Sequence, residues 1–90
     1  MEQNEISEHQ ARIFRFLQQH TQWQTSQQVA IGAQVAMRTA RHHLLQLTQL
    51  GLLDQAEVFP GHRYRLSSKA DKRNGAYMRR LETACEIFEM

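Results

Sequence analysis

Apolar residues recur at helical spacing in several stretches of the chain and at alternate positions in one. The first helical stretch covers residues 8–20, where Ile13 and Leu17 stand four residues apart on one face. Ser7 and Gln10 have the spacing of a capping box, which marks the start of a helix. This pattern predicts an amphipathic first helix.

Two more helices are predicted in the next thirty residues or so. The motif TSQQVA, from Thr25 onward, repeats the capping-box spacing and predicts a short second helix. A third helix is predicted over 36–49, because Ala40, Leu44 and Leu47 recur in steps of three and four. These three side chains are expected to face the core, with His43 or Leu50 beside them.

The pattern changes after Gly51, a residue suited to ending a helix in the left-handed conformation. Pro60-Gly61 is a strong turn signal, and Tyr64 and Leu66 beyond it alternate with arginines. We therefore predict a β-hairpin over about 52–66, with its turn around residues 60–62.

The C-terminal part of the chain is divided by its hydrophobicity. Residues 68–75 are polar and predict a linker, whereas residues 76–90 regain helical spacing and predict a fourth helix. The apolar stripe of this helix comprises Tyr77, Leu81, Ala84, Cys85 and Phe88. Two partners for this stripe are open: the first helix of the same chain, and a second copy. The small size of the chain favours the second copy, so we expect a homodimer with these five residues as its interface.

Composition limits the class of protein. The chain has 90 residues, enough for one domain, which we place at residues 7–67 behind a flexible tail at residues 1–6. Its single cysteine excludes an internal disulfide and a cysteine-rich zinc site. It holds no apolar run long enough for a membrane span, and its acidic start is unlike a signal peptide. We expect a cytoplasmic protein.

Positive charge is concentrated in one block of the sequence. Residues 36–73 hold seven basic and three acidic residues, a net charge of +4, whereas the segments on either side each carry −1. A basic block of this kind is typical of nucleic-acid binding, although it also occurs on solvated surfaces.

The order helix, short helix, helix, hairpin is the topology of a winged helix-turn-helix. From Ile13 to Leu66 the sequence resembles the winged-helix regulators of the MarR and ArsR type, through the segments IFRFL, TSQQVA, AMRTARHHLLQL, LGLL and YRLS. The resemblance implies a mainly α (α+β) fold of three helices and a β-hairpin wing, here followed by the additional C-terminal helix. Gln34 stands where these families often have a turn glycine, and a glycine occurs earlier, at Gly32. The third helix lacks the cysteines of ArsR-type metal sensors, so no metal or other cofactor is expected.

In helix-turn-helix proteins the second helix of the motif lies in the major groove. The face of the third helix opposite its core positions carries Leu45 and six polar or flexible candidates for DNA contact: Met37, Arg38, Thr39, Arg41, His42 and Gln46. The two arginines are expected to read bases, because a guanidinium can donate two bonds to guanine. In the wing, His62, Arg63 and Arg65 suit the DNA backbone or minor groove. Lys69 and Lys72 would add attraction independent of sequence.

These observations predict sequence-specific binding of double-stranded DNA, most simply by a dimeric transcriptional repressor with the helix at 36–49 in the major groove and the wing around 58–65. Two alternatives remain open: a winged helix that binds another protein, and a DNA-binding accessory factor in replication, recombination or plasmid and phage maintenance. Adjacent His42 and His43 point about 100° apart on a helix and cannot easily share one metal ion. No residues suggest a catalytic pocket, a membrane partner or an identifiable effector.

Overall fold

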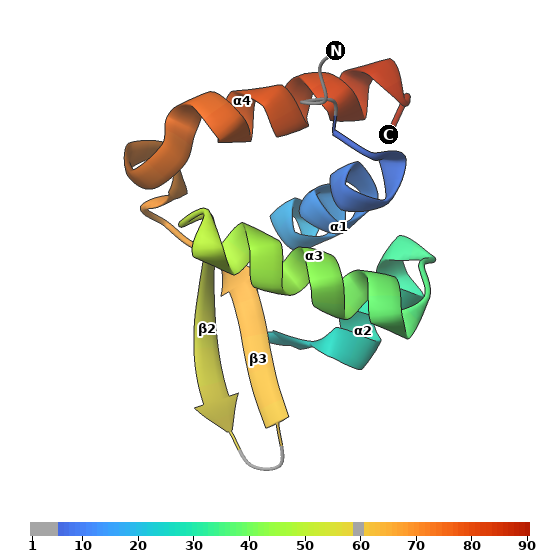
Figure 1. Cartoon of the computed structure of the whole chain (residues 1–90), viewed down its shortest axis with the longest axis vertical. Helices are drawn as coiled ribbons and strands as arrows, with labels where there is room; N and C mark the ends of the chain where they lie inside the picture. The colour runs from blue at the N-terminus through green and yellow to red at the C-terminus, as the bar shows by residue number, and fades with distance from the viewer. Residues whose placement is uncertain (1–5, 59–60) are drawn as a thin grey trace.

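The computed structural model describes residues 6–58 and 61–90, which form four helices and a three-stranded antiparallel sheet (Figure 1). The elements, in chain order, are α1 Glu8–Gln19, β1 Gln24–Thr25, α2 Ser26–Ala33, α3 Met37–Gln49, β2 Leu53–Val58, β3 Gly61–Leu66 and α4 Ala70–Ile87. This is the predicted arrangement of three helices, a hairpin and an additional C-terminal helix. The flexible tail predicted at residues 1–6 lies, except for Ile6, outside the described residues.

The sheet has the strand order β1-β3-β2, with both pairs antiparallel. In the hairpin, Leu53 pairs with Leu66 and Val58 with Gly61, so Gly61 and His62, predicted in the turn, belong to strand β3. Pro60, the remaining residue of the predicted turn, lies outside the described residues. Strand β1 was not predicted, because a strand of two residues is too short to show alternation.

The core lies between α1 and the elements that surround it. Figure 1 shows α4 and the hairpin at opposite ends of the molecule, with α1 and α3 between them. The side chains of Ile13, Phe14 and Leu17 on α1 are fully buried. Leu44 of α3 and Leu81 of α4 are equally buried, so α1 is covered from two sides. The C-terminal helix α4, which could have packed on a second copy, is thus part of the core of its own chain.

Both predicted helix starts are confirmed. The Ser7 side chain accepts a hydrogen bond from the backbone N–H of Gln10 at 3.1 Å, and this bond satisfies one of the free donors at the start of α1. Thr25 and Gln28 form a complete capping box at the start of α2, each side chain accepting from the other residue's backbone N–H.

The turn between α2 and α3 explains why this sequence has Gln34 at the usual turn-glycine position and a glycine earlier, at Gly32. Gln34 adopts the left-handed conformation, with a φ of 59°, so the turn keeps the shape that a glycine would give it. Gly32 is needed for a different reason. A Cβ at this position would collide with the ring of Phe16, which packs directly against the backbone of α2.

The linker predicted over residues 68–75 is corrected by the structure, in which α4 already begins at Ala70. Ala70 is buried and anchors one polar turn of helix, which a hydrophobicity pattern could not reveal. Asn74 then departs from helical geometry, with φ −159° and ψ 61°. Its side chain accepts a hydrogen bond from the N–H of Tyr77 at 3.4 Å, in the manner of an N-cap. Most of the predicted linker is therefore the first turn of α4, which ends in a kink at Asn74.

Candidate nucleic-acid interface

The exposed face of α3 is the centre of the candidate interface. Ala40, Leu44 and Leu47 are fully buried, which confirms the predicted inward face. Arg38, Arg41 and His42 point to the other side and are exposed. Within the described residues, neither arginine forms an ion pair. Two guanidinium groups are therefore free to bind an anionic or hydrogen-bonding partner.

Three of the residues predicted on this face are half-buried or already hydrogen-bonded. Met37 is half-buried against the core, because it precedes Ala40 by three residues and so shares its side of the helix. Thr39 is also half-buried. Gln46 is exposed, but its Oε1 already accepts a hydrogen bond from Gln10 of α1 at 2.9 Å.

Two residues complete the exposed face. Leu45 is 52% exposed and Gln49 is exposed as well, and they continue the stripe of Arg38 and His42 in steps of three and four. We define these four residues together with Arg41 as the α3 face. The same spacing argument that found Arg38 could have found Gln49 in the sequence.

The wing residues divide into free and engaged side chains. Arg63 of β3 is exposed and has no ion pair within the described residues. His62 lies 3.2 Å from the carboxylate of Glu57 across the hairpin. Arg65 lies 3.5 Å from Asp54 and stacks over the ring of Trp23, 4.3 Å from its centroid. Arg65 thus fixes the base of the wing. Arg63 is the cation of the wing that has no ion pair among the described residues.

The first turn of α4 contributes further positive charge. Lys69 and Lys72 are exposed, as expected of residues that would bind phosphates without reading sequence. Arg73 lies 3.6 Å from Asp54, whose carboxylate therefore holds one arginine from the sheet and one from α4.

A polar cluster links α3 to its supporting helices. Gln10 is buried, and its Nε2 lies 2.9 Å from the Oε1 of Gln46 and 3.3 Å from the Nδ1 of His43. The hydroxyl of Tyr77 donates to the Oε1 of Gln10 at 2.6 Å. Partial burial lowers the pKa of His43, with smaller contributions from the nearby charges of His42 and His9. The hydrogen bond to Gln46 raises the pKa of His43, but burial outweighs it and favours a neutral imidazole.

The predicted dimer stripe on α4 is corrected for most of its members. Its buried members are Leu81, Ala84 and Cys85. They pack against α1 of the same chain, one of the two partners that the sequence pattern left open. Burial raises the pKa of the Cys85 thiol, whose sulfur donates to the carbonyl of Ala11 at 3.5 Å. Tyr77 is half-buried, and Phe88 remains exposed.

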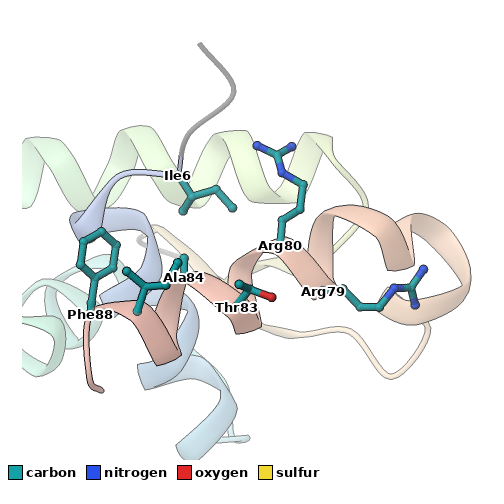
Figure 2. A pocket seen from close by; sticks show the side chains of 7 residues that line it. Ile6, Arg79, Arg80, Thr83, Ala84 and Phe88 are labelled. Carbon is teal, nitrogen blue, oxygen red and sulfur yellow. The ribbon is translucent and has the colours of Figure 1, made fainter. Parts of the chain in front are cut away.

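The surface of α4 carries a groove of about 530 Å³ instead. Figure 2 shows Ile6 above the side chains of α4, with Phe88 at one end of the groove and Arg79 and Arg80 at the other. Thr83, Ala84 and Ile87 complete its lining, and Ile87 is 70% exposed. Apolar surface that the described residues leave uncovered is therefore concentrated at the C-terminal end of α4.

Two other kinds of site are absent within residues 6–58 and 61–90. Among these residues, no group of three histidine, cysteine or acidic side chains could hold a metal ion. None of the helices there is both long and apolar enough to cross a membrane.

Comparison with known proteins identifies the fold. No protein-family model and no curated protein sequence matches the chain. A MarR-family transcriptional regulator from Silicibacter pomeroyi superposes with a TM-score of 0.66 over 92% of this chain, at 16% identity. The chain spans only 57% of that regulator's length. The predicted winged-helix fold of the MarR type is thereby confirmed.

Two further solved structures share this fold. Sso10a-2, a DNA-binding protein from Sulfolobus solfataricus, has a TM-score of 0.62 at 16% identity, over 89% of this chain and 84% of its own. MepR, a transcription regulator of the Staphylococcus aureus multidrug efflux pump MepA, has a TM-score of 0.60 at 13% identity, over 94% of this chain and 64% of its own. At such identities the likeness extends to the fold alone.

Proposed function

We propose that the chain binds double-stranded DNA in a sequence-specific manner and regulates transcription, with the α3 face in the major groove. The observation that carries the proposal is the free, exposed pair Arg38 and Arg41 on the second helix of a helix-turn-helix whose other side is core. A guanidinium placed in the major groove can bond guanine O6 and N7 together. The solved structures that share the fold include a DNA-binding protein and transcription regulators, which supports this assignment.

The wing and the start of α4 would position the protein on the duplex. Arg63 is the free cation of the hairpin, and Lys69 and Lys72 are exposed near the base of the wing. Contacts of this kind bind phosphates and fix orientation, whereas sequence is read at base edges. Substituting a base reader and substituting a phosphate binder should therefore have different effects.

The experiment that tests this function is a selection of random duplex DNA by the purified chain at near-physiological salt. We expect one motif to be enriched. Arg38→Ala and Arg41→Ala should each cost about 1–3 kcal/mol on the selected duplex and relax preference at one base pair. The matched control Lys72→Ala should weaken binding to selected and random duplexes alike. Equal losses on both duplexes for the α3 variants would reject base reading, and no binding at all would favour a protein-binding winged helix.

We also propose that the working form is a homodimer, a repressor on a two-fold symmetric site, joined through the outer surface of α4. Charge supports an antiparallel pairing of two copies of α4 about Thr83. Arg80 precedes Thr83 by three residues and Glu86 follows it by three, and both are exposed. A two-fold axis at Thr83 would place Arg80 of each copy opposite Glu86 of the other. Exposed Ile87, in the next turn, would be covered by the pairing.

A charge-swap series tests this interface. Arg80→Glu and Glu86→Arg should each weaken association, measured as mass in solution against concentration, because each places like charges opposite one another. The double variant Arg80→Glu/Glu86→Arg should restore it. Failure of the double variant to recover, or a wild-type chain that stays monomeric, would reject the antiparallel pairing. Half-sites about one helical turn, ~34 Å, apart are expected in the selected DNA.

A further inference from the structure

Leu45 is an unusual residue on the α3 face. It is the large apolar side chain of this face, and 52% of its surface is exposed. The other members of the face are cationic or polar: Arg38, Arg41, His42 and Gln49. The core positions of α3 are filled by other residues, and Leu45 does not belong to the hydrophobic cluster that they form. Among the described residues, the Leu45 side chain is therefore not part of the packed core, and about half of its surface is open to a partner.

The position of Leu45 restricts the chemistry of a partner. Arg38, His42, Leu45 and Gln49 follow one another in steps of four, three and four, so Leu45 lies in the middle of the stripe and not at its edge. A partner that extends along this stripe from Arg38 to Gln49 must also cover Leu45. That partner is expected to be anionic, yet to offer an apolar group between its polar ones.

The major groove of DNA fits this description. Its edges present hydrogen-bond donors and acceptors, and the apolar group among them is the C5-methyl of thymine. We propose that Leu45 is a specificity-determining residue that packs against a thymine methyl group, so that the preferred site contains a thymine beneath it. This inference rests on the proposed DNA binding.

Deoxyuridine tests the contact, because it differs from thymidine only in lacking that methyl group. Each thymine of the selected duplex is replaced singly by deoxyuridine, and affinity is measured for the wild-type chain. In each half-site, one thymine position should be sensitive: its single replacement should weaken binding about fourfold, the value expected for loss of one buried methyl or methylene group. The Leu45→Ala variant should bind the thymine and deoxyuridine forms of that duplex equally well.

A matched control separates this effect from general apolar contact. Ile31 is 69% exposed but lies on α2, outside the α3 face. Ile31→Ala should keep the wild-type discrimination between thymine and deoxyuridine. Persistence of that discrimination in Leu45→Ala would overturn the inference, because another residue would then be reading the methyl group.

The outcomes also distinguish this inference from the function on which it rests. If a duplex is selected but every deoxyuridine replacement is silent in the wild-type chain, the role of Leu45 is rejected and DNA binding stands. If no duplex is selected at all, both proposals fail. The wild-type scan needs no variant, so the result does not depend on whether Leu45→Ala folds.

Discussion

The hydroxyl of Tyr77 donates a hydrogen bond to the side chain of Gln10 at 2.6 Å, across 67 residues of sequence. The amide of Gln10 in turn lies within hydrogen-bond distance of Gln46 and His43 on α3. The Tyr77 ring also contacts Arg80 of α4, whose guanidinium stacks over it at 5.0 Å from the centroid. A continuous series of contacts thus joins the surface of α4 to the helix that carries the α3 face.

Removing the Tyr77 hydroxyl should lower stability. In Tyr77→Phe the Oε1 of Gln10 loses its donor in a mostly buried setting, and we expect a loss of about 1 kcal/mol in the free energy of unfolding. Urea denaturation measures it. Tyr64→Phe is the matched control, because the Tyr64 hydroxyl accepts only one long bond, 3.5 Å, from Gln55. Equal losses in the two variants would show that the bond to Gln10 adds nothing.

Stability should decrease on acidification through His43. Burial holds its pKa in the folded state below the ordinary value of about 6.5. Between these two pKa values the unfolded chain binds a proton that the folded chain does not, so acid favours unfolding. The stabilisation is therefore complete above about 6.5 and is lost as the pH falls through the folded pKa.

Urea denaturation at several pH values between 5 and 8 measures this dependence. His43→Gln should flatten it, because the titrating group is removed while a side chain able to bond Gln10 remains. His42→Gln, which alters the exposed neighbouring histidine, should leave most of the dependence in place. An unchanged slope in His43→Gln would assign the acid sensitivity to another group.

Asn74 should stabilise two helices at once. Its Oδ1 accepts from the N–H of Tyr77 in α4, and its Nδ2 donates to the carbonyl of Leu50 at the end of α3 at 3.2 Å. We expect Asn74→Ala to cost about 1–2 kcal/mol in the free energy of unfolding. Asn74→Asp keeps the acceptor but loses the donor, so its loss should be intermediate. If Asp and Ala behave alike, the bond to Leu50 carries the effect and the cap contributes little.

Gly32→Ala should be destabilising, although glycine to alanine within a helix ordinarily stabilises by about 0.5–1 kcal/mol. The added Cβ would enter the space of the Phe16 ring, and forced repacking typically costs about 1–3 kcal/mol. Gly61→Ala provides the comparison, because among the described residues beyond its chain neighbours no atom lies within 4 Å of its added Cβ. A thermal melt of both variants gives the sign directly, and a stabilised Gly32→Ala would mean that the ring moves aside freely.

The elements that the sequence predicts well are those whose signals are local. The caps at Ser7 and Thr25 depend on residues three positions apart, and the inward face of α3 depends on a repeat of its own apolar residues. Such patterns do not require knowledge of the rest of the chain. The winged-helix topology followed from their order.

The predictions that needed correction depend on distant partners. Gln46 is polar and lies near the predicted DNA face, and only the position of Gln10 on α1 shows that its side chain is engaged elsewhere. Ala70 gives no periodic signal, yet its burial starts α4 within a polar segment. The stripe at Leu81 could have faced α1 or a second copy with the same spacing, since periodicity identifies an apolar face and not what covers it.

The pairing of Asp54 with both Arg65 and Arg73 changes how the basic block of the sequence should be counted. Two of its seven cations are held by that carboxylate, which leaves Arg38, Arg41, Arg63, Lys69 and Lys72 without an ion pair within the described residues. Each phosphate neutralised on duplex DNA releases about 0.9 of a condensed counterion. Three of these five, Arg63, Lys69 and Lys72, are the proposed phosphate contacts, so one protomer would displace about 2.7 monovalent ions. Salt dependence near this value, rather than near that of all seven cations, is the thermodynamic signature of a wing whose base is already neutralised.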